Sequence, residues 1–258
     1  MQPISTERYC AGILSSTDIF ARLVDGADLT KKVPTCPEWT LRQLATHLGR
    51  AQRWAAQIVV TRSAEMIPFR EVPDGRLPDD PARHADWLRA GAERLVTALR
   101  DGGSDPVWTS AGIRPASFWA RRMAHETAVH RADAELAAGL RPTFAPDLAA
   151  DAIDEWLGFL SGPAPEEQDR RLEALPDGMV LHVHATDNQL GGDGEWMVRR
   201  EGSQVLVEHG HGKGDAAVRG PAGSLLLVLV RRVPPDDPQV EVLGDRALLD
   251  RWLAATPF

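Results

Sequence analysis

The spacing of apolar residues changes along this chain, and this change restricts the fold more than any other feature. Up to about residue 160 the apolar side chains recur three and four positions apart, which is typical of amphipathic helices. After about residue 179 short runs rich in valine and leucine are separated by glycine turns, which is typical of strands. Prolines and charged residues dominate residues 162–178. We therefore expect a helical domain over residues 1–161, a linker over 162–178 and a small α+β domain over 179–258.

The helical part contains four long segments. They cover about residues 5–24, a stretch starting at residue 40, residues 82–100 and residues 116–138, and a shorter helix is expected over residues 146–160. Thr40 and Gln43 have the spacing of a capping box, in which each side chain bonds a backbone N–H of the first turn. Four long helices joined by loops predict a four-helix bundle, a fold in which facing helices can supply metal ligands.

The second part predicts strands and two helices. The strands are expected over residues 179–186, 195–200, 204–209, 216–219 and 240–243, and the helices over residues 221–230 and 246–254. No internal repeat is visible. The fold class is thus a four-helix bundle followed by a small α+β domain.

Composition restricts the partners and the compartment. Lysine and arginine number 29 against 37 acidic residues, a formal charge of −8, which argues against nucleic acid or an anionic membrane as a partner. The longest apolar run, residues 225–230, is too short to span a bilayer, and the first residues lack a signal-peptide pattern. The two cysteines, Cys10 and Cys36, form no disulfide framework. We expect a cytoplasmic protein that binds small molecules, as a monomer or a homodimer.

The segment RRMAHETAVHRADAE, residues 121–135, predicts a metal site. Glu126 and His130 are four residues apart, so a helix projects both from one face. His47, on an earlier helix at its core-facing position, is the best candidate for a third ligand. The segment is not a zinc-protease motif, because His125 and His130 are five residues apart and diverge by about 140° around the helix. His125 is expected at the surface or behind the ligands.

Two other interpretations of these residues stay open. His47 could be an ordinary core histidine, and Glu126 could form a salt bridge with Arg122 or a distant arginine. Three protein ligands would leave coordination positions open, as catalytic sites do. Asp133, one turn after His130, could accept a hydrogen bond from a ligand imidazole. Zinc, nickel and iron all suit two imidazoles and a carboxylate, and zinc is the commonest.

Three segments, TCPEWTLRQLATHLGR, RRMAHETAVHRADAE and the C-terminal run from AAVRGPAGSLLLVLVRR to VEVLGDRALLDRWL, resemble the mycothiol-dependent maleylpyruvate isomerase family of actinobacteria. The resemblance covers nearly the whole chain and implies a DinB-like four-helix bundle followed by a sterol-carrier-like domain. It places the family's metal ligands on His47, Glu126 and His130, and it implies zinc, with mycothiol as thiol cosubstrate.

The resemblance also implies an arginine of the C-terminal domain in catalysis. The family's position falls on Arg232, although Arg231 stands where members carry glycine. We expect Arg232 and Asp133 to act in catalysis, and Arg231 and Arg219 to bind the cosubstrate. Other arginines, Arg114, Arg121 and Arg122 among them, could hold a dicarboxylate substrate, although solvated surface is the simpler interpretation.

The implied function is a mycothiol-dependent transferase or isomerase that acts on a small electrophile through a metal-activated thiolate. Two alternatives are a non-catalytic carrier of an apolar ligand, with the helix over residues 221–230 lining its pocket, and a metal-linked interaction protein. Metal content and thiol binding distinguish them from the enzyme.

Overall fold

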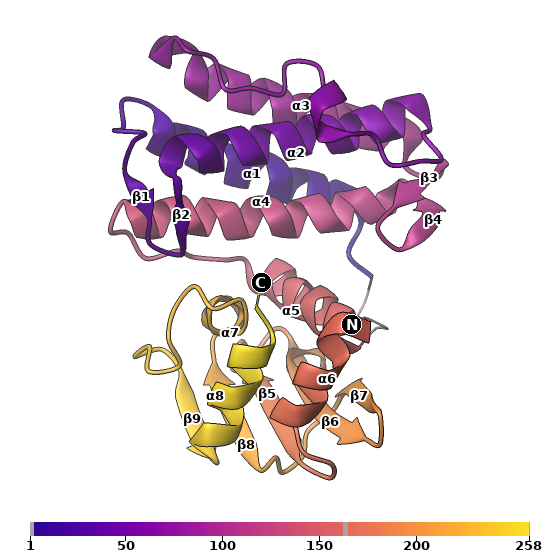
Figure 1. The fold of residues 1–258 in the computed structure, drawn as a ribbon, viewed down its shortest axis with the longest axis vertical. Helices are drawn as coiled ribbons and strands as arrows, with labels where there is room; N and C mark the ends of the chain where they lie inside the picture. Colours follow the sequence, from indigo (N-terminus) through magenta and orange to yellow (C-terminus); the bar gives the residue numbers. More distant parts are fainter. Residues whose placement is uncertain (1–2, 162–164, 258) are drawn as a thin grey trace. The chain divides into compact units, whose positions relative to one another are not determined.

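The computed structural model describes residues 3–161 and 165–257 of the chain (Figure 1). It divides into two compact units, Gln2–Pro142 and Thr143–Phe258. Within the described residues, no helix combines the length and apolar character needed to cross a bilayer. The predicted fold class, a helical part followed by a sheet-containing part, is confirmed.

The N-terminal unit is built on four long helices, as expected. They are α1 Thr6–Val24, α2 Leu41–Thr61, α3 His84–Gly102 and α4 Ser117–Ala137. Ser5 caps α1, and Thr40 caps α2 with the predicted capping box, in which Gln43 bonds back to Thr40. Helices α1 and α2 each pack against both α3 and α4.

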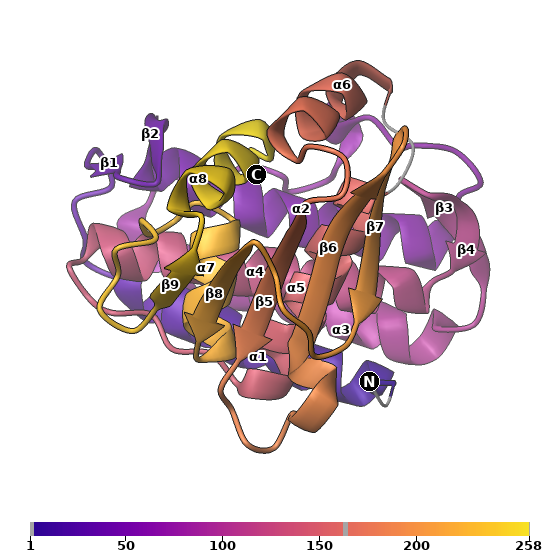
Figure 2. The same cartoon turned by 90° about the horizontal axis from the view of Figure 1, so that it is seen from below.

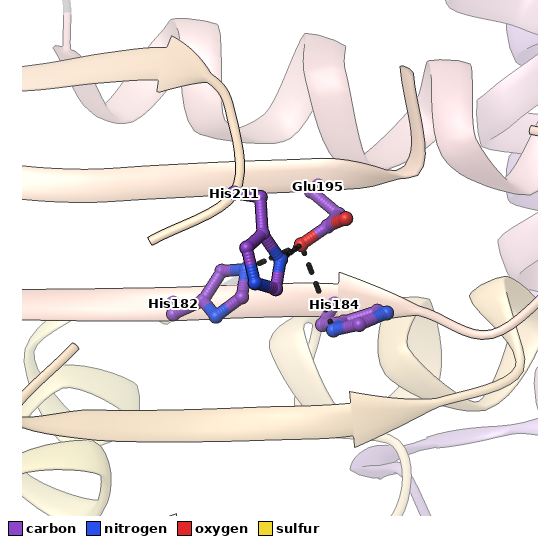
Figure 3. A group of neighbouring side chains, drawn as sticks. All are labelled: His182, His184, Glu195 and His211. Atoms are coloured by element: carbon purple, nitrogen blue, oxygen red, sulfur yellow. Dashed lines mark hydrogen bonds and ion pairs between the residues drawn. The ribbon is translucent and has the colours of Figure 1, made fainter. Parts of the chain in front are cut away.

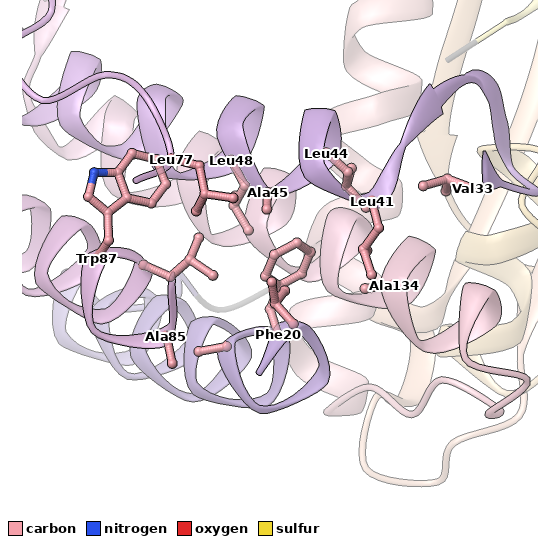
Figure 4. Close-up of a cluster of buried hydrophobic side chains, with 13 residues drawn as sticks. Phe20, Val33, Leu41, Leu44, Ala45, Leu48, Leu77, Ala85, Trp87 and Ala134 are labelled. Carbon is pink, nitrogen blue, oxygen red and sulfur yellow. The ribbon is translucent and has the colours of Figure 1, made fainter. Parts of the chain in front are cut away.

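One buried cluster joins all four of these helices with the segments between them (Figure 4). Phe20 of α1 and Leu44 of α2 are fully buried in it, and Trp87 of α3 packs at one end. Leucine and phenylalanine side chains of this kind each contribute about 1.5–3 kcal/mol when removed from water. The cluster therefore supplies much of the energy that holds α2 beside its neighbours.

The connections between the helices are more ordered than expected. Two short antiparallel hairpins, β1 Lys32–Val33 with β2 Cys36–Thr40 and β3 Pro106–Thr109 with β4 Gly112–Pro115, replace expected loops. Single 3₁₀ turns cover Phe69–Glu71 and Pro81–Arg83. The prolines of the two hairpins suggested loops, but every strand of a two-stranded ribbon is an edge strand, where proline is tolerated.

The C-terminal unit has one sheet and four helices among its described residues. The strands are β5 Val180–Ala185, β6 Glu195–Glu201, β7 Gln204–His209, β8 Ala216–Gly220 and β9 Glu241–Gly244. The helices are α5 Pro146–Ser161, α6 Pro165–Ala174, α7 Ala222–Leu229 and α8 Arg246–Ala255, and a 3₁₀ turn covers Gly191–Gly194.

The five strands are ordered β7-β6-β5-β8-β9 (Figure 2). Strand β5 is central and pairs parallel with β8, whereas all other pairs are antiparallel. Leu181 and Val183 of β5 point toward Leu229 of α7 and Trp252 of α8. Because side chains alternate along a strand, His182 and His184 point to the opposite face of the sheet.

The structure corrects the expected boundary at residue 161. The division lies between Pro142 and Thr143, so α5 belongs to the C-terminal unit, where it packs on α7 and β7. Asp154 of α5 accepts a hydrogen bond from the indole N–H of Trp196 on β6, at 2.8 Å. Helical spacing predicted that α5 would form but could not tell which core it would join.

The expected linker over residues 162–178 is also corrected in part. Its first residues, 162–164, lie outside the described residues, but α6 covers Pro165–Ala174. Arg171 and Leu175 are buried, and Arg171 donates to the carbonyl oxygen of Leu160. A proline at the first position of a helix leaves the helix intact, so the composition was misleading.

The contact between α2 and α3 depends on a glycine. A Cβ atom at Gly49 would lie 2.1 Å from the nearest ring carbon of Trp87. The guanidinium of Arg53 covers the other part of this contact, 4.1 Å from the Trp87 ring centre, and donates to the Trp87 carbonyl oxygen at 2.7 Å. The two helices can approach this closely only because residue 49 lacks a side chain.

We predict that Gly49→Ala lowers the free energy of unfolding by about 1–3 kcal/mol, because overpacking outweighs the better helix propensity of alanine. Gly158→Ala is the matched control, since Gly158 lies inside α5 with open space around it. The control should stabilise its unit by about 0.5–1 kcal/mol. Urea unfolding measures both, and a stabilising Gly49→Ala would contradict the tight contact.

Candidate functional site

The three residues expected to bind metal meet between α2 and α4. His47 comes from α2, whereas Glu126 and His130 come from α4. His47 Nε2 lies 3.1 Å from Glu126 Oε1, and His130 Nε2 lies 3.2 Å from the same oxygen. One possible ligand atom from each residue lies within 4.8 Å of the others. The structure therefore brings together side chains that are 79 residues apart in the sequence.

Local sequence explains how these side chains are aimed. The spacing of four residues puts Glu126 and His130 one helical turn apart on the same face of α4. The capping box at Thr40 fixes the start of α2 and thus the rotation at which His47 projects. The helix position of His47 suggested that it faces the core, but its side chain is 33% exposed, so it does not lie in the core.

Asp133 orients the His130 imidazole. Its Oδ2 accepts from His130 Nδ1 at 2.9 Å, and its Oδ1 accepts from the Thr35 hydroxyl at 2.6 Å. The Cys36 thiol also lies 3.9 Å from Oδ2. The Asp133 side chain is fully buried. Thr35 and Cys36, from the hairpin before α2, help to hold it in place. With Nδ1 occupied in this way, Nε2 of His130 points toward Glu126.

Charge also fixes the Glu126 carboxylate. Arg122 donates to Oε2 at 2.9 Å, which leaves Oε1 facing the two imidazoles. Burial opposes the charged carboxylate, but hydrogen bonds from His130 and His47 and the Arg122 charge hold the pKa of Glu126 well below its usual value. Burial also opposes the charged form of His130, yet the bonds to Asp133 and Glu126 outweigh it and raise the pKa of His130 to about 9.

His125 does point away from the ligands, but it is not a surface residue. It is 3% exposed, and its ring meets that of Tyr9 on α1 edge to face, with centroids 6.0 Å apart. Helix α4 is buried on several sides, so a residue that turns away from one neighbour meets another. The expectation of a surface position for His125 is therefore wrong.

A depression of about 510 Å³ opens beside His47. Its wall consists of residues from α2 and its flanks: Trp39, Arg42, Gln43, Thr46, His47, Arg50 and Phe69. The Trp39 ring packs on His47 with centroids 4.8 Å apart. Sequence reasoning missed Arg42 and Arg50, although polar residues at 42, 46 and 50 recur at helical spacing and could have indicated this face.

The expected cosubstrate and catalytic arginines lie in the C-terminal unit. Arg219 is on β8, opposite His184 in register, and lies 3.4 Å from the Glu241 carboxylate. Arg231 follows α7 with a positive φ of 59°. Arg232 donates to the carbonyl oxygen of Val230 at 2.9 Å. The roles of all three stay predictions.

His47, Glu126 and His130 together are called the bundle cluster below. The chemistry of this cluster suits a divalent metal ion. Two imidazole nitrogens and one carboxylate oxygen are ligands that zinc and related ions accept. Asp133 stands behind His130, as a carboxylate commonly stands behind a metal-bound histidine. His47, Glu126 and His130 could hold such an ion and would leave coordination positions open.

Comparison with known proteins gives the family. The model of the mycothiol maleylpyruvate isomerase N-terminal domain matches residues 12–135, and the model of the corresponding C-terminal domain matches residues 147–251. The chain belongs to the mycothiol maleylpyruvate isomerase family. All three residues of the bundle cluster lie within the match to this family's N-terminal domain.

Solved structures agree on the fold. Two crystal structures of mycothiol-dependent maleylpyruvate isomerase, one of them a histidine-to-alanine mutant, are similar with a TM-score of 0.57 each. They share 15% and 16% identity with this chain, and each match covers 93% of both chains. No curated protein sequence gives a significant match.

The ion pair between Glu126 and His130 should make the stability of the metal-free protein depend on pH. His130 has a raised pKa, so its contribution is complete below 6.5 and is lost as pH rises through about 9. Glu126 has a lowered pKa, so its contribution is present above 4.5 and is lost in acid. We expect chelator-treated protein to lose stability from pH 7 to about pH 10, and Glu126→Gln to reduce this loss. Thermal unfolding across that range measures the difference, and equal pH slopes in the two proteins would contradict the pairing.

Proposed function

We propose that this protein is a metal-dependent enzyme that uses mycothiol to isomerise or to conjugate a small electrophilic substrate. The observation that carries the proposal is the convergence of His47, Glu126 and His130 beside an open depression, within a chain of this family. Zinc is the ion that the donor set favours. A bound dication would lower the pKa of a thiol and supply a thiolate at neutral pH.

The protein's own residues keep this site ready. Arg122 and the two imidazoles compensate the Glu126 carboxylate, which is only 21% exposed. Asp133 holds the Nδ1 proton of His130 and thereby keeps Nε2 available. Trp39 packs beside both imidazoles, with ring centroids 4.8 Å from His47 and 6.2 Å from His130.

The depression favours a substrate that carries a carboxylate. Arg42 and Arg50 contribute two guanidinium groups to its wall. Arg42 is already bonded to Asp79 at 3.0 Å, and Arg50 donates through Nε to the Gly75 carbonyl oxygen at 2.7 Å. The Asp79 carboxylate offsets the charge of Arg42, whereas the partner of Arg50 here is an uncharged carbonyl, so Arg50 is the better candidate to bind a planar carboxylate. Maleylpyruvate, the substrate in the name of the similar structures, has this character.

Helix α7, which suggested the carrier alternative, does not support it. The apolar side chains of α7 are buried within the C-terminal unit, with Leu225 to Leu229 each at most 4% exposed. The cavity between α7, α8 and the sheet encloses only about 10 Å³. That volume is close to the space of one water molecule, so core packing explains this helix.

The direct test is an activity assay on metal-loaded protein with mycothiol. With maleylpyruvate we expect conversion to the trans isomer, and with a general electrophile such as a bimane the S-conjugate is the product of a transferase. His47→Ala should lower either activity at least about 100-fold, because it removes a ligand. Glu93→Gln, an exposed carboxylate on α3, is the control. Absence of both products from zinc-loaded wild type would overturn the proposed function.

Asp133→Asn tests the orienting role of Asp133. The amide keeps the size of the carboxylate but removes its charge, so metal affinity should fall by about 10–100-fold while the fold is retained. Competition with a chromogenic chelator measures the affinity, and circular dichroism verifies the fold. Unchanged affinity would mean that Asp133 only anchors the β1–β2 hairpin.

A further inference from the structure

A second group of metal-binding side chains lies in the C-terminal unit, on the face of the sheet opposite α7 and α8 (Figure 3). His182 and His184 alternate with the buried residues of β5 and therefore project together. Glu195 begins β6 and pairs with His184 in the antiparallel register, so it stands on the same face. Three of the four side chains are thus placed by the register of two neighbouring strands.

The fourth residue, His211, is brought in by the loop between β7 and β8. This loop passes closely over the sheet: a Cβ atom at Gly214 would lie 3.1 Å from the Cβ of His182 and 2.6 Å from the Ala216 carbonyl oxygen. Only glycine allows this path without displacing its neighbours. As a result His182 is just 5% exposed, whereas His211 is 75% exposed at its side chain.

All three imidazoles converge on one carboxylate oxygen. Glu195 Oε2 lies 2.9 Å from His182 Nε2, 2.7 Å from His211 Nδ1 and 3.6 Å from His184 Nδ1. A carboxylate offers two oxygens with about four acceptor positions. If the three imidazoles served only as hydrogen-bond donors, they could have been distributed over both oxygens of Glu195. One possible ligand atom from each of the four residues lies within 4.8 Å of the others.

The charges around the group also permit a cation. Arg219 stands beside His184 on β8, but the Glu241 carboxylate lies 3.4 Å from its guanidinium and offsets its charge. Glu195 supplies the one negative charge that a site of three neutral imidazoles would have. A dication would therefore meet a carboxylate and three neutral donors.

We propose that His182, His184, Glu195 and His211 form a second metal site, which binds a divalent transition-metal ion of the zinc class. Three imidazoles and one carboxylate suit Zn²⁺, Ni²⁺, Co²⁺ and Cu²⁺, whereas Mg²⁺ and Ca²⁺ prefer sites built from oxygen atoms. The ion would join β5, β6 and the loop of residues 210–215. Because His211 is the exposed member, it is the ligand that binding would immobilise.

Zinc titration of the full chain tests this site separately from the bundle site. In a Glu126→Ala background, chelator-treated protein should still bind about one zinc ion per chain, measured by competition with a chromogenic chelator and by elemental analysis. Adding His211→Ala should weaken this binding more than about 100-fold, since loss of even an indirect partner costs about 10–100-fold. His209→Ala, which replaces a neighbouring histidine outside the group, should leave it unchanged.

His184→Ala is the second variant, and circular dichroism with thermal unfolding establishes that each variant folds. Zinc binding that survives both His184→Ala and His211→Ala in the Glu126→Ala background would overturn the proposal, as would a chain that binds no zinc there. Stronger binding of Mg²⁺ than of Zn²⁺ would overturn the metal class. Zinc that depends on Glu126 reports on the bundle site alone, so failure of one site is distinguishable from failure of the other.

Discussion

A carboxylate withdrawn from water is the constraint on which the N-terminal unit depends. Glu126 lies near the middle of α4, where an unpaired charge would cost several kcal/mol, of the order known for buried ion pairs that lose a partner. Arg122 from its own helix offsets part of this cost, and His47 must come from α2. The distance between α2 and α4 is therefore set by chemistry as well as by apolar packing. Asp133 extends the same requirement to the β1–β2 hairpin through Thr35.

Most of the helices and the bundle cluster could be predicted because their signals are local. Helical spacing aligns Glu126 with His130, and the capping pair Thr40 and Gln43 marks the start of α2 within the sequence itself. The membership of α5 was not predictable in this way, since an apolar face shows that a helix packs but not against what. Proline-rich composition concealed α6, because a proline that begins a helix resembles one that prevents it.

The second cluster depends on information that is not local. The alternation of His182 and His184 is visible in the sequence, but Glu195 joins them through strand register and His211 through the path of a loop. The depression beside the bundle cluster is a similar case. Arg42 and Arg50 recur with Thr46 on one face of α2, yet only the folded chain shows that this face borders open space beside His47. Periodicity identifies faces, whereas tertiary structure decides what each face meets.

The parallel pairing of β5 with β8 has a consequence for the order of folding. Antiparallel neighbours such as β6 and β7 can pair as soon as both strands have been synthesised, because a short turn joins them. The β5–β8 ladder must wait until the intervening hairpin and the loop of residues 210–215 have crossed from one side of β5 to the other. Contacts distant in sequence form slowly, since the entropy of closing the loop is lost before the pairing compensates for it. The glycines of that loop thus take part in the folding step that pairs β8 with β5 and completes the centre of the sheet.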